Sequence, residues 1–233
     1  MDFQGRHVVV TGGTGALGGA VTGALIASGA TCHIPHHASE DLGRFPFRDH
    51  TQAKLTAGID LADEAAVTSF YATVPQLWGS IHLAGGFAPG KVSETGKTAL
   101  MKQIETNLAT CFLCCRAAVN AIVPTGAGGR IVNVAARPAL EWRGGAGMAA
   151  YTASKAAVAA LTVALAEEVA ADGILVNAVA PSIMDTPANR KAMPNADYAA
   201  WPKVEEVAAT IAFLASPDNK VTRGAIVPVY GRS

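Results

Sequence analysis

The feature that most constrains the fold is a cluster of glycines between a short apolar run and an alanine-rich run. Residues 7–11 read HVVVT and residues 12–19 read GGTGALGG. The first run is typical of a buried parallel strand, and residues 16–28 have helical spacing up to a stop at Gly29. A strand that turns sharply into a helix aims free N–H groups at one point, which favours a bound phosphate. We expect a pyrophosphate at this loop; the alternative is a tight turn that binds nothing.

The same alternation of β-branched runs and alanine-rich runs continues along the chain. It predicts crossover units and a parallel sheet that is covered by helices on both faces. With 233 residues, half of them hydrophobic, the chain can bury one large core. We predict an α/β fold, a single Rossmann-type doubly wound domain over residues 1–233 with a substrate loop at about 182–202. Strands are expected at 7–11, 31–35, 57–61, 80–84, 130–135, 174–180 and 224–229, helices at 16–28, from about 63, and at 98–123, 149–171 and 204–215, and the least regular segments at 36–56, 86–97, 136–148 and 182–202.

Charge and hydropathy exclude several classes of function. Lys plus Arg equals Asp plus Glu, so the formal net charge is zero, which disfavours a nucleic-acid-binding surface. The N-terminus MDFQGRHVVVTGG lacks the pattern of a secretory signal. A membrane span would need roughly 18 uncharged apolar residues, and we expect none. We therefore predict a cytoplasmic protein that does not enter a membrane.

Four cysteines occur, at Cys32, Cys111, Cys114 and Cys115. Three of them fall within a single predicted helix, too close along it for a natural disulfide framework. A metal site is conceivable, but the nearest upstream histidine is His82 and no second cysteine pair follows. We expect small apolar residues in a core helix in a reducing compartment, and no metal.

A tyrosine and a lysine stand four residues apart where the second long helix begins. In Tyr151-Thr152-Ala153-Ser154-Lys155 the phenol and the ammonium share one helix face. A free phenol, with a pKa of about 10, is a poor base near neutrality. A neighbouring cation would lower that pKa and make Tyr151 an acid–base candidate. A surface tyrosine beside a solvated lysine is the alternative.

Together these motifs resemble the short-chain dehydrogenases/reductases over essentially the whole chain. TGGTGALG at 11–18 resembles the family's TGxxxGxG, LAG at 83–85 its NNAG (with His82-Leu83 for the asparagines), YTASK at 151–155 its YxxxK, and APSIMDTP at 180–187 its APGxxxTP. The resemblance implies an oxidoreductase that uses NAD(P)(H). It also implies catalytic roles for Asn107, Tyr151 and Lys155, and cofactor contacts from Gly12, Thr14, Ala16, Leu17, His36, Asp60, Leu61, Ala84, Gly85, Lys155, Pro181, Ile183 and Thr186.

One element of the family pattern is missing. The family has a serine after the fifth strand, which hydrogen-bonds the substrate oxygen. Here alignment on the strand places Ala136 at that position, and the spacing to Tyr151 places Pro138 there. One such donor contributes about 10²–10³ in rate. Trp142 Nε1 or Arg143, in the same loop, is a candidate replacement.

With this departure, the sequence resembles the dihydropteridine-reductase-like subgroup of the family. The shared features are GALG at 15–18, AGG at 84–86 and alanine at position 136. This resemblance implies reduction of a C=N or quinonoid ring as an alternative to a carbonyl. A third hypothesis, from another class, is a catalytically silent sensor or scaffold that only binds the cofactor.

The end of the second strand bears on the choice of cofactor. His36 stands where NAD-selective relatives commonly carry an aspartate, so no carboxylate repels a 2′-phosphate there. His36, His37 or Arg44 could contact that phosphate, while Gly15 occupies the loop position where NADP users often have a basic residue. We predict a slight preference for NADP.

Aromatic residues gather in the loops at the carboxyl edge of the predicted sheet. They favour a small, hydrophobic or cyclic substrate. The alternative is that these residues cover the core or a subunit contact. The resemblance further implies a homotetramer or dimer through the helices at 98–123 and 149–171. The predicted substrate-side residues are Phe87, Ala136, Trp142, Tyr151 and Trp201.

Overall fold

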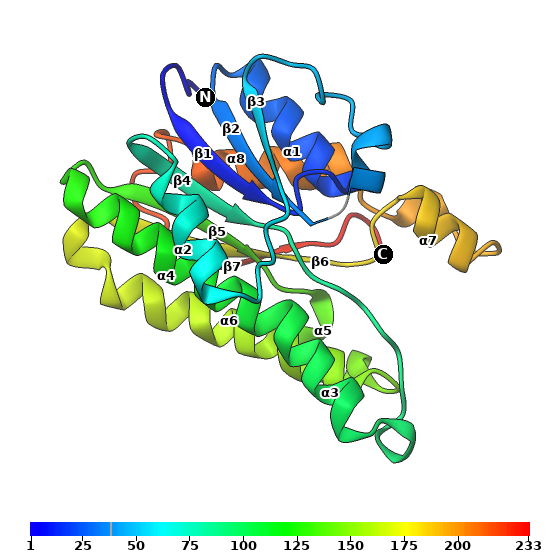
Figure 1. Ribbon diagram of the computed structural model, residues 1–233. Coiled ribbons are helices and arrows are strands. Elements are labelled where there is room, and N and C mark those ends of the chain that lie inside the picture. The colour runs from blue at the N-terminus through cyan, green and yellow to red at the C-terminus, as the bar shows by residue number, and fades with distance from the viewer. Residues whose placement is uncertain (38) are drawn as a thin grey trace.

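The computed structural model describes residues 1–37 and 39–233 and shows one seven-stranded sheet in the order β3-β2-β1-β4-β5-β6-β7 (Figure 1). Every neighbouring pair in this sheet is parallel. The predicted Rossmann-type doubly wound fold is therefore confirmed. The strands are β1 (His7–Thr11), β2 (Thr31–His36), β3 (Ala53–Ala57), β4 (Leu77–His82), β5 (Gly129–Val134), β6 (Ile174–Pro181) and β7 (Ile226–Val229).

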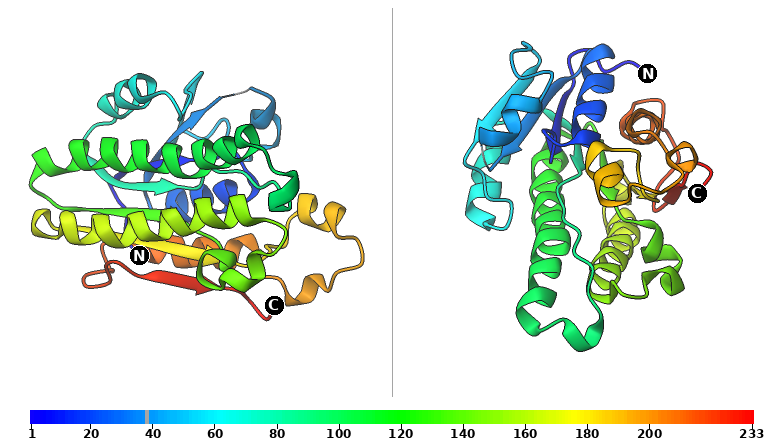
Figure 2. Two further views of the ribbon diagram at one scale, coloured as in Figure 1. Left: turned by 90° about the horizontal axis from the view of Figure 1, so that it is seen from below. Right: turned by 90° about the vertical axis from the view of Figure 1, so that its right-hand side faces the viewer.

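Helices cover both faces of the sheet, as Figure 2 shows in its right-hand view. The helices α1 (Ala16–Ala27) and α8 (Val204–Ala215) pack together on one face, and α2 (Glu64–Ala72), α4 (Thr110–Ile122) and α6 (Ala149–Glu168) lie on the other. Successive strand residues point to opposite faces. Val8 and Val10 accordingly belong to the α1/α8 core, while Val9 belongs to the α2/α4/α6 core.

The long helix expected at 98–123 is interrupted by one wide turn. It is built from α3 (Lys97–Ile104), a π-helical turn (Glu105–Ala109) and α4. Such π-turns are frequent at functional sites. Asn107, a buried member of the predicted catalytic set, lies within it. The remaining short elements are α5 (Arg137–Leu140), α7 (Pro187–Ala192) and 3₁₀ turns at Ser39–Arg44, Val92–Glu94, Val123–Thr125, Trp142–Gly145, Ala170–Asp172 and Tyr198–Ala200.

Two predicted strand positions are wrong. The third strand was expected at 57–61, but β3 covers Ala53–Ala57, because its residues pair with β2 and Gly58 then turns away with a φ of 74°. β3 is an edge strand that is only partly buried, so its hydrophobic pattern is weak. The fourth strand was expected at 80–84 and is β4, Leu77–His82. The chain leaves the sheet after His82, which carries residues 83–86 to the site described below.

Two helical segments meet the length and hydropathy criteria for a membrane span, contrary to the sequence expectation. They are Lys97–Thr125 and Ala149–Glu168, with mean hydropathies of 1.5 and 1.4. In the fold, α4 and α6 pack against strands β4 to β6. The two apolar windows are 39% and 33% buried, so part of their apolar surface faces the sheet and the rest faces away from it.

Candidate functional site

The site lies at the carboxyl edge of the sheet, where the strand order reverses between β1 and β4. Chain connections leave β1 toward one side and β4 toward the other, so a crevice forms between them. The loops that follow β1, β4 and β5 all end at this edge. They carry the glycine loop, the LAGG segment and the approach to Tyr151, which are far apart in sequence.

The glycine loop is shaped by contacts that exclude side chains. Gly12 has a φ of 65°, and a Cβ there would lie 2.7 Å from the backbone nitrogen of Ala84. A Cβ on Gly18 would lie 2.6 Å from Gly13 Cα. Ala16, where the family pattern has glycine, is exposed at the first residue of α1, so its methyl group is accommodated. The departure at Ala16 therefore leaves the loop intact.

The loop also leaves hydrogen-bond donors available. α1 begins after Gly15, which has no side chain to cap the helix, so the first-turn N–H groups are open to a ligand. Leu17 is buried in the core, which restricts its expected cofactor contact to its backbone. Thr14 lies in the same loop and is half-buried. An anion at the helix N-terminus fits this arrangement.

Asn107 ties the segment after β4 to α6. Its side-chain oxygen accepts from the backbone N–H of Gly86 at 2.9 Å, and its nitrogen donates to Gly86 O at 3.0 Å and to Ser154 Oγ at 3.1 Å. A Cβ on Gly85 would lie 2.8 Å from Asn107 Oδ1 and 3.2 Å from Lys155 Nζ. The side-chain amide of Asn107 thus acts as an anchor, and Gly85 is the residue small enough to sit beside it. Ser154, which sequence reasoning left without a role, lies inside the YTASK motif that could have indicated it.

The side chain of Lys155 is buried within this site. It is 6% exposed, and its Nζ donates to the backbone oxygen of Val134 at 2.8 Å, at the end of β5. Burial lowers the pKa of Lys155 to about 8, because an apolar environment disfavours the charged ammonium. The backbone partner was not visible in the sequence, since it depends on how β5 meets α6.

Tyr151 lies on the same face of α6, half-buried, with the ring of Phe87 against it edge to face at 4.9 Å between centroids. Burial raises the pKa of Tyr151 to about 12. The sequence-based expectation that Lys155 lowers this pKa is therefore not met in this structure, where desolvation of the phenol is the dominant effect. Tyr151 is accordingly protonated at neutral pH.

The remaining predicted cofactor contacts come from the end of β2, from the segment after β3 and from the segment around the end of β6. His36 is 7% exposed, and its Nδ1 has no hydrogen-bond partner among the described residues. Asp60 is exposed and its Oδ1 accepts from the N–H of Ala62, while Leu61 packs partly against the core. Thr186 caps α7 by accepting from the N–H of Asn189, which leaves its hydroxyl hydrogen free to donate. Pro181, at the end of β6, is buried, and Ile183 is 43% exposed.

The substrate-side predictions divide into two groups. Phe87 is 59% exposed beside Tyr151, and Ala136 is buried at the start of α5, after β5. Trp142 is exposed, but its Nε1 donates to the backbone oxygen of Ala139, so the expected role as a replacement donor is not supported. Trp201 is 8% exposed and packs on Tyr198, as a support of its loop rather than a surface for ligand.

A hollow of about 940 Å³ opens beside the glycine loop. Its lining includes residues 14–16, residues 186–188 and Arg44, but neither Tyr151 nor Lys155. It continues along the outer side of α1. The hollow therefore borders the phosphate end of the crevice and leaves the tyrosine outside it.

The observed residues fit a nicotinamide dinucleotide. The N–H groups at the start of α1 lie beside the glycine loop without a side-chain cap. Among the described residues, His36 Nδ1 has no hydrogen-bond partner, and it lies at the end of β2, where this fold places the adenosine ribose. Lys155 and Tyr151 lie one turn apart on α6 at the other end of the site, whereas Thr186 lines the hollow beside the glycine loop. Such a group would extend from His36 across the glycine loop toward Tyr151.

Comparison with known proteins gives a consistent result. The profile of the family described as short chain dehydrogenase matches residues 6–197. The chain is 35% identical to the cis-4-hydroxycyclohexanecarboxylate dehydrogenase of Sinomonas cyclohexanicum, covering 98% of this chain and 96% of the relative. It is 30% identical to the 3beta-hydroxysteroid dehydrogenase of Mediterraneibacter gnavus, covering 98% and 95%.

Solved structures agree with these relatives. The fold matches the structure described as ElxO with NADP bound with a TM-score of 0.87 at 25% identity, covering 97% of each chain. It matches a short chain dehydrogenase/reductase family protein with a TM-score of 0.90 at 27% identity, covering 99% of this chain and 98% of that one. The likeness extends over the whole chain rather than over the nucleotide-binding half alone.

Proposed function

The chain belongs to the short chain dehydrogenase family of oxidoreductases, and we propose that it reduces a cyclic, hydrophobic ketone to the alcohol with NADPH, with Tyr151 as the proton donor. The observation that carries the proposal is the placement of three side chains along the segment that follows β4. Asn107 and Lys155 lie beside Gly85, and Tyr151, one turn before Lys155 on α6, packs its ring against Phe87 of the same segment. A protein that only bound the cofactor would have little need of the phenol.

The protonation state of Tyr151 is compatible with its proposed role as proton donor. Because burial raises the pKa of Tyr151 to about 12, the phenol carries its proton at neutral pH. The chemistry that bound NADPH would supply here is hydride donation to the carbonyl carbon. Tyr151 then donates its proton to the oxygen that becomes the alcohol. Lys155, held on Val134 O, would bond the nicotinamide ribose, and Thr186 the carboxamide.

The proposed substrate class rests on the site and on two relatives. Phe87 presents an exposed aromatic ring against Tyr151, and the buried Ala136 contributes only a methyl group where the family has a hydroxyl. The two relatives described above are named for ring alcohols, a hydroxycyclohexanecarboxylate and a hydroxysteroid. We expect a six-membered ring ketone whose flat face packs on Phe87.

The preference for NADP is proposed from His36. Its Nδ1 has no hydrogen-bond partner in the part of the chain that the structure describes, and it stands where NAD-selective relatives commonly place a carboxylate. His36 would therefore accept a ribose phosphate without repulsion. ElxO, a structural neighbour, is described as binding NADP.

Two measurements test the proposal in sequence. A fluorescence titration with NADPH and with NADH is expected to show tighter binding of NADPH. Turnover is then measured with substituted cyclohexanones as oxidants of NADPH. Binding of neither cofactor would contradict the oxidoreductase, while binding without turnover of any ring ketone would favour the cofactor-binding sensor.

A second candidate is reduction of a C=N or quinonoid ring, as in dihydropteridine reductase. The observation that favours it is Ala136, together with GALG at 15–18 and AGG at 84–86. An oxyanion donor matters less for such a substrate, because charge develops on nitrogen or over a ring. A quinonoid dihydropterin assayed beside the cyclohexanones would separate the two candidates by their kcat/KM.

We also propose a cytoplasmic homo-oligomer formed through α4 and α6. Phe112 on α4 is 51% exposed and Val163 on α6 is 45% exposed, so both helices present apolar side chains away from the sheet. Size-exclusion chromatography with light scattering is expected to give a dimer or tetramer. Phe112→Glu should shift the protein toward the monomer, and an unchanged mass would contradict this interface. Cell fractionation tests the compartment.

A further inference from the structure

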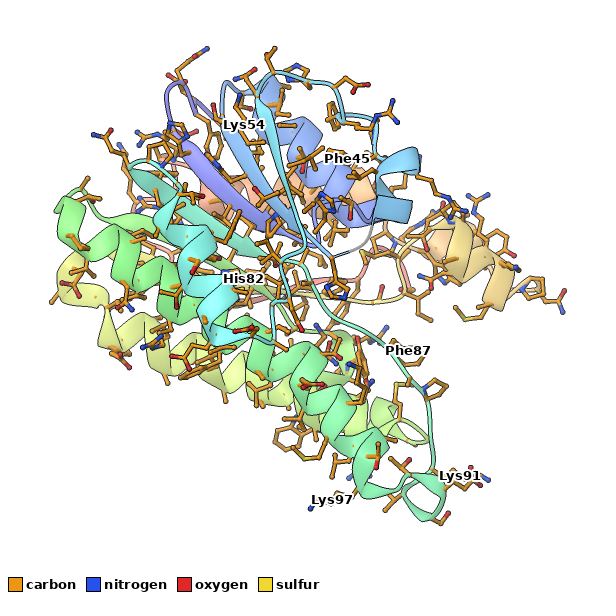
Figure 3. The ribbon with its side chains drawn as sticks, in the orientation of Figure 1. Phe45, Lys54, His82, Phe87, Lys91 and Lys97 are labelled. Atoms are coloured by element: carbon orange, nitrogen blue, oxygen red, sulfur yellow. The ribbon has the colours of Figure 1, made fainter. Side chains whose placement is uncertain are left out.

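A second cluster of reactive side chains lies beneath the site, between β4 and α4. His82 ends β4, and Cys111 and Cys115 lie one turn apart on α4. One ligand atom from each residue lies within 4.8 Å of the other two. All three side chains are at most 5% exposed, and Figure 3 shows His82 in the middle of the molecule. Neither the proposed reduction nor its cofactor uses this cluster.

We propose that His82, Cys111 and Cys115 form a binding site for a soft monovalent cation, copper(I) being the physiological case. The distances suit this assignment. Metal–sulfur bonds of about 2.3 Å and metal–nitrogen bonds of about 2.0 Å place a sulfur ligand and a nitrogen ligand about 3.5–3.8 Å apart. Cys115 Sγ lies 3.5 Å from His82 Nδ1. Cys111 needs only a small movement toward the pair.

The surroundings of His82 allow Nδ1 to bind a cation. In this structure Nδ1 is hydrogen-bonded to Asn133 Oδ1 at 2.8 Å, so binding a cation breaks that bond and moves the proton to Nε2. Ser80 Oγ lies 2.8 Å from Nε2 and can accept that hydrogen bond. The Tyr71 hydroxyl lies 2.7 Å from Ser80 Oγ. Histidine ligands of metals usually donate their second N–H to such a partner. A hydrogen-bond acceptor for the Nε2 proton of His82 is therefore already present.

The number of protein ligands favours a monovalent ion over zinc. Structural zinc sites almost always have four protein ligands, and two thiolates with one imidazole supply three. Asn133 Oδ1 lies beside the cluster, 2.8 Å from His82 Nδ1, but an amide oxygen is a harder donor than thiolate or imidazole.

The binding experiment uses the whole protein without oxygen. Copper(I) is supplied as its complex with a coloured chelator, and its transfer to the protein is followed by loss of that colour. One arm uses the native protein, and a second arm refolds the chain with copper(I) present, because the site is buried. One equivalent bound in either arm is expected. No transfer in both arms, or zinc(II) competing copper(I) out of the site, would overturn the proposal.

Variants on the same helix locate the ion. Cys111→Ser and Cys115→Ser should each abolish binding. Cys114→Ser is the matched control, since Cys114 is equally buried on α4 but is not one of the three ligands. Ser80→Ala should weaken binding about 10–100-fold by removing the partner of the histidine ring. Binding that depends on Cys114 and not on Cys111 would contradict the site.

A spectroscopic measurement keeps the test independent of variant folding. X-ray absorption at the copper edge of the loaded wild-type protein is expected to show two sulfur neighbours at about 2.3 Å and one nitrogen at about 2.0 Å. A first shell without nitrogen would exclude His82 and overturn the proposal. Because NADPH binding and ketone reduction are measured separately, failure of this site leaves the proposed enzyme function untouched.

Discussion

The glycine loop and the Tyr151 region share one edge of the sheet but are built in different ways. The loop is a backbone structure, in which Gly12 and Gly18 permit close approaches that any Cβ would block. The Tyr151 region is a side-chain structure, in which Asn107 joins the segment after β4 to α6 and Lys155 joins α6 to β5. A cradle of backbone N–H groups can be recognised from local sequence, whereas a network of side chains requires the whole fold.

The comparison predicts that the two regions fail separately. Damage to the side-chain region should remove turnover and leave cofactor binding, while damage to the loop should weaken binding and stability. Four experiments test this separation, from the largest expected effect to the smallest.

Replacing the phenol should give the largest effect. Tyr151→Phe is expected to lower kcat by about 10²–10⁴, the usual contribution of a general acid, with NADPH affinity nearly unchanged. Stopped-flow reduction and the fluorescence titration measure the two quantities on one preparation. Ser69→Ala, an exposed position on α2, serves as the control. Retained turnover would remove Tyr151 from the mechanism.

Crowding the glycine loop should act on binding and stability. Gly12→Ala combines a left-handed backbone with a contact at 2.7 Å, and is expected to lower the free energy of unfolding by about 2–5 kcal/mol and to weaken NADPH binding. Gly58→Ala is the matched control, because its φ is 74° but nothing lies within 4 Å of the added Cβ. It should lose about 1–2 kcal/mol. Equal losses in urea denaturation would mean that crowding at Gly12 is unimportant.

The buried ammonium of Lys155 should make stability depend on pH. Its pKa is lowered from 10.5 to about 8 in the fold, so between these values the unfolded chain binds more protons than the folded one. Stability from this group therefore rises as pH increases from about 8 to 10.5, by the order of 1–3 kcal/mol. In Lys155→Met this rise should be absent. Parallel curves for the two proteins in urea titrations would contradict the charged, buried state.

Changing the end of β2 should give the smallest effect. His36→Asp introduces a carboxylate where a 2′-phosphate would lie, and is expected to weaken NADPH binding about tenfold, close to 1.4 kcal/mol, while NADH binding is kept or improved. His37→Asp, at the exposed neighbouring position, is the control. If both variants bound NADPH equally, the proposed role of His36 would be lost.

Most of the fold could be predicted from the sequence, because the pattern of strands and helices is local. The helix at 204–215 and the start of a helix near residue 63 were predicted correctly, and the strands other than β3 and β4 are displaced by at most two residues. β3 was misplaced because an edge strand is half-exposed and shows little hydrophobic pattern. The π-turn at Asn107 was not predicted, since it depends on contacts with Gly86 and Ser154 rather than on propensity.

Sequence alone determined the glycine loop, the Tyr151–Lys155 spacing and the absence of a hydroxyl at Ala136, because each is a matter of residue identity and local geometry. Only the tertiary structure decided how these groups are solvated. Burial holds the phenol of Tyr151 protonated and lowers the pKa of Lys155, against the expectation drawn from their spacing. Tertiary contacts also brought His82 from β4 onto the cysteines of α4. Desolvation and proximity of distant residues arise from packing, which no local pattern records.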